Sequence, residues 1–227
     1  LENNTTGSNN VGFGTGTLTA NTTGSNNVAI GNNSLDASET TGNNTAVGHE
    51  SMTTTTTGSS NVAIGYQSLR QQTTGSNNTA LGFQAVYTNT TASNNTGIGY
   101  NALLLNTTGA QNVAVGSTAL NSNTTGANNV AIGQTSLSGN TTASNNTAVG
   151  RNSLSSNTTG ADNVAVGTSA LFSNTTATGN TAIGRLALLN NTTGTQNVAV
   201  GAFSLDTNTT GAGNTSVGYN TLQANTT

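Results

Sequence analysis

The chain has 227 residues, of which only 4% are charged and 31% are apolar, so its composition excludes a domain with a large hydrophobic core. Its formal net charge of −3 is spread over few groups, which leaves no charged surface for nucleic acid or an anionic membrane. The absence of cysteine excludes disulfides and thiolate metal sites, and no apolar run in this segment is as long as a membrane span.

A glycine recurs every 17 residues and defines a repeat, which we call a coil. Relative to this reference glycine, asparagine stands four residues before, an apolar residue one before, and a large apolar residue four after. We therefore expect a single continuous array over residues 1–227, a piece of a longer fibrous protein because it starts and stops inside a repeat. The reference glycines are Gly14, Gly31, Gly48, Gly65, Gly82, Gly99, Gly116, Gly133, Gly150, Gly167, Gly184, Gly201 and Gly218.

The elements of one coil follow in chain order. An Asn-Thr-Thr-Gly turn, such as residues 21–24, precedes a short strand with alternating polarity at residues 27–30. The reference glycine Gly31 then makes a turn, and a second short strand is expected at Ser34 and Leu35. Abundant Thr, Val, Ile, Gly and Asn disfavour a helix, and the lack of proline suits hydrogen-bonded strands. The sequence predicts an all-β fold, a parallel β-solenoid or β-roll of thirteen 17-residue coils.

Stacked coils place equivalent residues in columns. We expect the apolar residues one before and four after the glycine to face inward, together with the residue three before, which is Val or Thr. Stacked amides can satisfy one another, so the asparagine and reference-glycine columns are expected to form a structural ladder. Its first members are Asn27, Asn44, Asn61, Asn78, Gly31, Gly48, Gly65 and Gly82.

The residue two before the glycine is always small and is expected to point away from the core. A column without long side chains indicates that another backbone approaches closely. The sequence thus predicts an oligomer interface between sister chains at Ala29, Ala46, Ala63 and Ala80.

The motif Asn-Val-Ala-Ile-Gly-x-x-Ser-Leu, found at residues 27–35, 61–69 and 129–137, resembles the head repeats of trimeric autotransporter adhesins. Similar Asn-Thr-Thr-Gly arrays occur in bacterial surface fibres and phage tail fibres. The resemblance covers nearly the whole chain and implies a left-handed, trimeric β-roll in a secreted adhesive or structural fibre. The coil departs from the family in being longer, through its Asn-Thr-Thr turn.

Few residues could perform chemistry. His49 and Glu50 are adjacent and should point apart, and carboxylates are too sparse for a calcium array, so we expect no catalytic, metal or cofactor site and no enzyme. Aromatic residues directly after the reference glycine are either a stacked stabilising column or an adhesive stripe for a glycan or surface. These are Tyr66, Phe83, Tyr100 and Tyr219.

Asn-Thr-Thr is also an acceptor sequence for N-linked glycans, although turn chemistry explains the same residues. The sites are Asn21, Asn106, Asn123, Asn140, Asn157, Asn174, Asn191 and Asn208.

Three functions fit these observations. The first is a structural or adhesive shaft of an extracellular bacterial filament, homo-oligomeric and directed at a host or prey cell surface or a glycan. The second is a phage tail fibre, located on the virion. The third is an ice-binding solenoid presenting columns of threonine such as Thr23, Thr40, Thr57 and Thr74.

Overall fold

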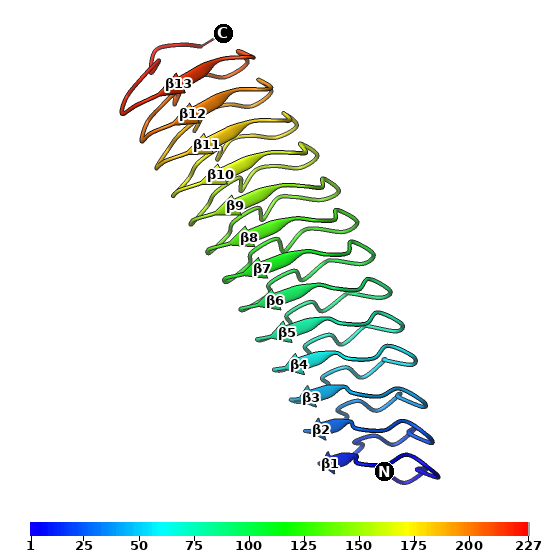
Figure 1. The fold of residues 1–227 in the computed structure, drawn as a ribbon. Helices are drawn as coiled ribbons and strands as arrows, with labels where there is room; N and C mark the ends of the chain where they lie inside the picture. Colours follow the sequence, from blue (N-terminus) through cyan, green and yellow to red (C-terminus); the bar gives the residue numbers. More distant parts are fainter. Residues whose placement is uncertain (227) are drawn as a thin grey trace. The chain divides into compact units, whose positions relative to one another are not determined.

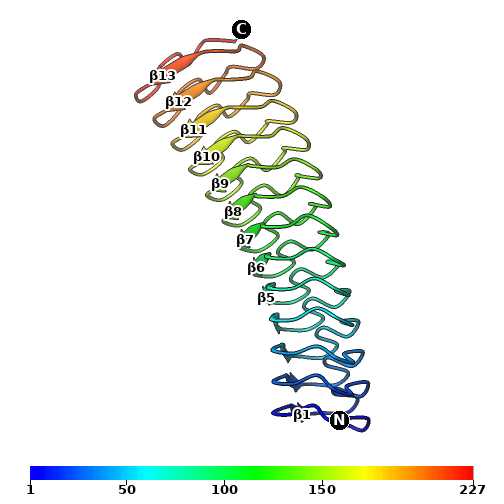
Figure 2. The same ribbon diagram turned by 45° about the vertical axis from the view of Figure 1, so that its right-hand side comes forward.

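The structure is a computed structural model and describes residues 1–226. The chain divides into two compact units, Leu1–Gln111 and Asn112–Thr227, and each is a parallel β-solenoid without a helix in the described residues. Every coil contributes one three-residue strand to the same side of its unit (Figures 1 and 2). The first unit holds β1 (Val11–Phe13), β2 (Val28–Ile30), β3 (Thr45–Val47), β4 (Val62–Ile64), β5 (Thr79–Leu81) and β6 (Thr96–Ile98). The second holds β7 (Val113–Val115), β8 (Val130–Ile132), β9 (Thr147–Val149), β10 (Val164–Val166), β11 (Thr181–Ile183), β12 (Val198–Val200) and β13 (Thr215–Val217).

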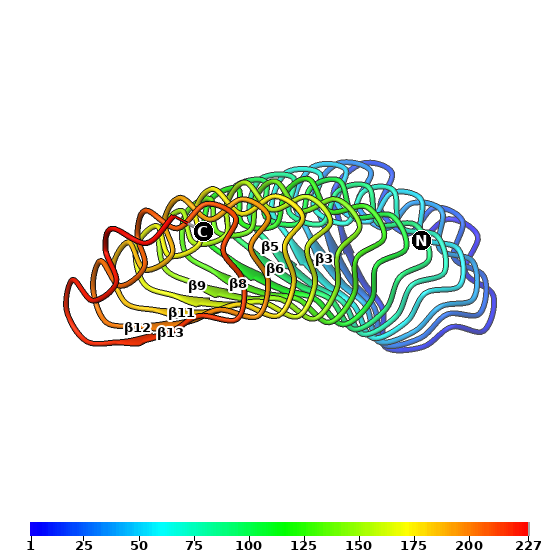
Figure 3. The same cartoon turned by 90° about the horizontal axis from the view of Figure 1, so that it is seen from above.

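Neighbouring strands within a unit pair in parallel and without any shift in register. Ala29 of β2 lies beside Ala46 of β3, and the residues on either side of this pair match in the same way. The same register holds from β1 to β6 in the first unit and from β7 to β13 in the second. Equivalent turns of successive coils therefore follow one another when a unit is viewed from above (Figure 3). The predicted all-β solenoid of 17-residue coils is confirmed.

The second predicted strand is wrong. In the β2 coil, Asn33 and Leu35 have φ angles of 52° and 51°, in the left-handed region, so the segment turns instead of extending. It nevertheless pairs with both neighbouring coils: the Asn33 amide donates to the Thr15 carbonyl of the coil before, at 2.9 Å, and the Leu35 amide to the Ser51 carbonyl of the coil after, at 3.0 Å. Positive φ is unfavourable for leucine, and we attribute its persistence to this ladder on both sides.

The predicted facing of the strand residues is also wrong. Ala29, Ala46, Ala63 and Ala80 are 0% exposed within a single chain, whereas Ile30 is 38% exposed and lies on the outer face. The alanine column is small because the opposite side of the same solenoid approaches it: a Cβ added at Gly97, in this column, would meet the Leu103 side chain and the Ala102 carbonyl of its own coil. Side chains enclosed by their own chain cannot form the predicted interface with a sister chain.

Leucine fills the interior opposite the alanines. Leu35, Leu69 and Leu103, four residues after their reference glycines, are fully buried in the first unit, as Leu137 and Leu171 are in the second. Each coil up to that of Gly201 therefore buries one large apolar side chain and leaves the apolar residue before its glycine on the outer face, whereas Leu222 of the last coil is 50% exposed. The apolar core is thin, and polar side chains complete it.

One column of buried asparagines runs four residues before the reference glycines. Asn44 is 0% exposed, and its backbone amide donates to the Asn27 Oδ1 of the coil before, at 3.0 Å. Its Nδ2 donates to the Gly58 carbonyl of the coil after, also at 3.0 Å. Asn61 and Asn78 continue the same pattern, so the predicted ladder is present in the first unit, and Asn146, Asn163 and Asn180 build it in the second.

A second buried column is formed by the first asparagine of each Asn-Thr-Thr turn. Asn157 donates through Nδ2 to the Gly160 carbonyl in its own turn, at 2.9 Å, and to Asn140 Oδ1 in the coil before, at 3.0 Å. Asn174 donates in turn to Asn157 Oδ1, at 2.8 Å. Because each of these amides both donates and accepts, an unbroken run of asparagines satisfies its buried polar groups without charge.

The reference glycines are required because neighbouring coils lie too close together for a side chain, in addition to their role in the turn. Gly65 has a φ of 134°, and a Cβ there would lie 2.3 Å from the Gly82 carbonyl oxygen of the next coil. The same contact with the following glycine recurs at Gly31 and Gly48. Any side chain in this column would separate two coils, which explains why the glycine never varies.

We expect a double-mutant cycle to expose the coupling between Val86 and Gly97. Val86 is the valine where other coils carry mostly leucine, and a Cβ at Gly97 would lie 2.4 Å from its Cγ2. Gly97→Ala alone should destabilise the unit by about 1–3 kcal/mol through overpacking. Gly97→Ala with Val86→Leu restores the usual alanine–leucine pair, as at Ala80 and Leu69, and should recover that loss. Thermal denaturation followed by circular dichroism gives the stability of the unmodified chain, the two single variants and the double variant. Additive changes in stability would contradict the coupling.

Removing one amide from the Asn-Thr-Thr column should be costly. Asn157→Ala leaves Asn140 Oδ1 and one Asn174 donor without their buried partner, so we expect a loss of about 2 kcal/mol. Thr159→Ala, in the same turn but exposed, is the matched control and should change stability by less than about 0.5 kcal/mol. Equal effects in urea denaturation would show that the buried ladder is not what stabilises the turn.

Candidate functional site

Four rings in the first unit form a continuous stack on the surface. His49, Tyr66, Phe83 and Tyr100 directly follow the reference glycines of the β3, β4, β5 and β6 coils, and the zero-shift register brings them together. Their successive ring centroids are 5.5, 5.1 and 5.3 Å apart, and their planes differ by 9° to 13°. The rings are exposed, with Tyr66 at 43% and Phe83 at 41%.

Stacking determines which part of each ring is available. Tyr66 and Phe83 have a neighbouring ring against both faces, so they offer their edges to the surroundings. A sugar normally packs its C–H face on the face of an aromatic ring, and these faces are occupied. The geometry therefore favours the stabilising column, in which each stacked pair contributes about 0.5–1.5 kcal/mol beyond area burial.

Tyr219 does not belong to this stack. It lies in the second unit, where it contacts Phe203 edge to face with ring centroids 6.0 Å apart. The guanidinium of Arg185 lies 5.1 Å from the centre of the Phe203 ring, on the same side of that unit. The four aromatic residues predicted as one stripe thus form two separate clusters.

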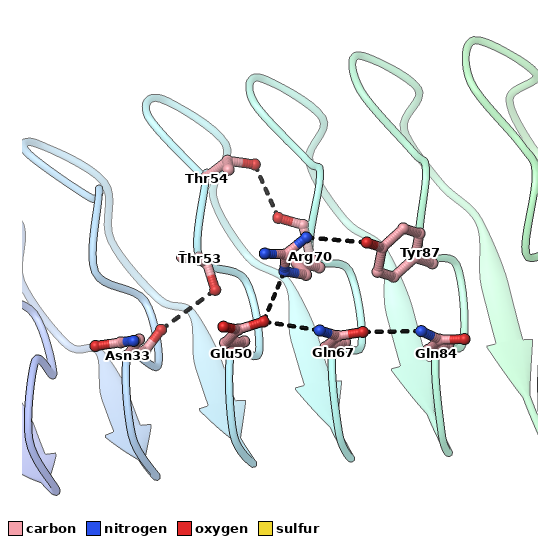
Figure 4. A network of polar contacts seen from close by, with 8 residues as sticks. All are labelled: Asn33, Glu50, Thr53, Thr54, Gln67, Arg70, Gln84 and Tyr87. Atoms are coloured by element: carbon pink, nitrogen blue, oxygen red, sulfur yellow. Dashed lines mark hydrogen bonds and ion pairs between the residues drawn. The ribbon is translucent and has the colours of Figure 1, made fainter.

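A polar network accompanies the aromatic stack (Figure 4). Glu50, Gln67 and Gln84 follow the stacked residues directly in the sequence, and they form a row in which Gln67 donates to Glu50 at 2.7 Å and Gln84 donates to Gln67 at 2.8 Å. Arg70 pairs with Glu50, its Nε 2.9 Å from Oε2, and donates through Nη1 to the Tyr87 hydroxyl at 2.9 Å. Three coils are thus connected by side chains alone.

The network holds its charged groups in their ionised forms. The hydrogen bond from Gln67, followed by the positive charge of Arg70, lowers the pKa of Glu50. The hydrogen bond to Tyr87 and the charge of Glu50 raise the pKa of Arg70. A carboxylate fixed in this way stabilises the coils as an ion pair and is poorly suited to donate a proton at neutral pH.

Residues 1–226 offer no concave site for chemistry. No pocket is found among them, and no group of three or more His, Cys, Asp or Glu side chains lies close enough to hold a metal ion. No helix in this part of the chain has the length and apolar character to cross a membrane.

The predicted glycan acceptors lie inside the solenoid. Their amide nitrogens donate to carbonyl oxygens of their own turn, as Asn106 does to the Gly109 carbonyl at 2.8 Å. A glycan on such a nitrogen has no room in the folded coil, so turn and ladder chemistry account for the motif. Each of the following is 0% exposed: Asn21, Asn106, Asn123, Asn140, Asn157, Asn174, Asn191 and Asn208.

The threonines proposed for ice binding reach the surface in single file. Thr23, Thr40 and Thr57 are exposed. The hydroxyl of the first threonine in an Asn-Thr-Thr turn is instead hydrogen-bonded within the chain: the Thr22 hydroxyl donates to the Glu39 carbonyl of the next coil at 3.0 Å. Each Asn-Thr-Thr turn thus presents one outward threonine, and the stacked turns form a single column of hydroxyls instead of a two-dimensional array.

Sequence reasoning missed the Glu50–Arg70–Tyr87 network and the place of His49 at the end of the aromatic stack. The signal was available, because Arg70 and Tyr87 are 17 residues apart, as are Glu50 and Gln67. Such contacts can be found by comparing the side chains that stand 17 residues apart in the variable columns as well as in the constant columns.

Comparison with known proteins gives no match: no family model fits the chain, and no curated protein or solved structure is significantly similar. The geometry alone therefore defines the class, a parallel β-solenoid repeat protein. No particular relative narrows this class further.

The Glu50 ion pair should give the first unit a measurable acid sensitivity. Because the folded pKa of Glu50 is lowered, its stabilisation is complete above the ordinary glutamate pKa of about 4.3 and is lost as the pH falls through the folded value. Glu50→Gln should reduce the dependence of stability on pH below about pH 5, and it should lower the stability at pH 7 by less than about 1 kcal/mol. Arg70→Gln should have a non-additive effect with Glu50→Gln; additive changes in thermal midpoint would contradict the pairing.

Proposed function

We propose that the chain is part of the shaft of an extracellular bacterial fibre, with a structural or adhesive role and no catalytic one. The observation that carries this proposal is the unbroken 17-residue period, in which backbone and buried amides of each coil bond to the coils before and after. Such a chain gains length by adding equal units, and its stability is approximately a sum over coils and their interfaces. The surface carries few charges and the described residues no pocket, which suits a spacer.

The resemblance to trimeric adhesin head repeats supports a homo-oligomer, a trimer in that family, presented outside the cell and directed at a cell surface or glycan. A tail fibre on a virion would use the same mechanics. The two differ in location, so antibodies to the coils distinguish them: labelling of intact source cells in electron microscopy supports the filament, and labelling of virions supports the tail fibre. Labelling confined to the cytoplasm would contradict both.

A shaft built from stacked coils should also unravel coil by coil under force. Each released coil adds 17 residues of extended chain, roughly 55–60 Å, so single-molecule extension of the full chain should show length increments in multiples of that value. Asn157→Ala should lower the force of the steps that involve its coil, while Thr159→Ala should not. A single extension without steps at very low force would contradict a role in which the shaft resists tension.

A further inference from the structure

One of the two buried amide columns is interrupted in the first unit. The first position of the Asn-Thr-Thr turn is asparagine at Asn21 and in every coil from Asn89 onward, but in three successive coils it is Ser38, Thr55 and Gln72. We call the turns that begin at these three residues the first, second and third interrupted turns. Ser38 and Thr55 are 0% exposed, so the interruption lies inside the solenoid and not on its surface.

The hydroxyls of these turns do not replace the missing amides. In an intact stretch, each asparagine donates to the amide oxygen of the coil before, as Asn157 does. Among the described residues no donor reaches the buried Asn21 Oδ1, and the buried Thr55 Oγ1 has no partner either. Ser38 bonds instead to the Thr41 hydroxyl within its own turn. A buried polar group without a partner favours an open conformation in which water can reach it.

The apolar core changes in one of the same coils. Met52 is fully buried at the position where most coils carry leucine, three residues before Thr55. Methionine is more flexible than leucine and fixes the packing of a core less firmly. The coil between Gly48 and Gly65 therefore lacks both the leucine and the asparagine that order the interior of other coils.

The side-chain network of Figure 4 spans these coils. The Thr53 hydroxyl donates to the Asn33 carbonyl at 3.3 Å and so joins the segments before and after the first interrupted turn. The ion pair between Glu50 and Arg70, the one ion pair within residues 1–226, does the same across the second. The hydrogen bond from Arg70 to the Tyr87 hydroxyl, at 2.9 Å, does so across the third.

The interior defect and the outer network thus coincide along the chain. We propose that the interrupted turns are the interior segment of the first unit that opens most readily, and that the network of Figure 4 is a clamp that keeps them closed. A bond between the residues before and after a turn must break before that turn can leave the stack. Because each coil contacts only its neighbours, the defect should weaken these coils and not distant ones. This inference concerns the fold and does not rest on the proposed role in a fibre.

Hydrogen exchange of the full chain, read by mass spectrometry, tests where the opening occurs. Residues 52–58 and 154–160 occupy equivalent positions, around Thr55 and Asn157 respectively. After correction for intrinsic rates, the amides of 52–58 should exchange at least about tenfold faster, the factor that corresponds to one unpaired buried group. Equal protection of the two segments would overturn the weak point.

Completing the column tests its cause. The variant Ser38→Asn with Thr41→Ala and Thr55→Asn gives the first interrupted turn the residues found at Asn89 and Ala92, and it gives the second turn its usual asparagine. Thr41→Ala removes the side chain that contacts Ser38. Exchange of residues 52–58 should slow at least about tenfold. If circular dichroism shows that the triple variant does not fold, Thr55→Asn alone replaces it.

The matched control places the same amides on the surface. It carries Thr41→Ala with Thr40→Asn and Thr57→Asn, at exposed positions of the same two turns, and should leave the exchange of residues 52–58 unchanged. Equal slowing by the control and the completed column, or slowing by neither, would overturn the role of the missing amides.

Removing the ion pair tests the clamp. Glu50→Gln with Arg70→Gln should accelerate the exchange of residues 52–75 about threefold to fivefold and leave residues 154–160 unchanged. Arg151→Gln with Asp162→Asn removes the same charges from the second unit and should not affect residues 52–75. Acceleration of both segments by one factor would show general destabilisation and would overturn the clamp, as would an unchanged rate in residues 52–75.

Discussion

The structure depends on one constraint, the backbone ladder that joins each coil to its two neighbours. The ladder includes the strand, the left-handed segment after the glycine and the Asn-Thr-Thr turn, as the backbone bonds of Leu35 to Ser51 and of Thr22 to Glu39 illustrate. One inserted residue would put all later partners of that coil out of register. This explains why the 17-residue length stays fixed while individual turn residues vary, as where Thr41 replaces the usual turn glycine.

The ladder also explains why the interior is so polar. A coil of 17 residues encloses little volume, and one leucine and one alanine nearly fill its apolar part. Buried asparagines complete the interior because their amides bond along the stack, where an identical amide is always in reach. Where asparagine is replaced the pattern weakens: Asn21 Oδ1 has no partner where Ser38 follows it, whereas Gln72 restores the bonds with its longer side chain.

The sequence predicts the period, the strand, its parallel register and the amide ladder, because these depend only on residues 17 apart. It fails on the facing of the strand and on the second strand, and the two errors share a cause. Alternation of Ala29 with Ile30 fits either orientation, and the choice depends on how close the opposite wall lies. That distance is set by the left-handed conformations of Asn33 and Leu35, and a leucine with positive φ has no sequence signal.

Because each strand buries alanine and exposes isoleucine or valine, the single chain keeps apolar side chains on its surface. The coil cannot simply be reversed, since Ile64 in place of Ala63 would meet the leucine side of the same solenoid, where even the methyl group of an alanine at Gly97 meets Val86. The thin coil therefore places the larger apolar side chains of its strands on the outer face. In this fold, the narrow coil that allows close stacking also leaves apolar side chains partly exposed on the outer face of the strands.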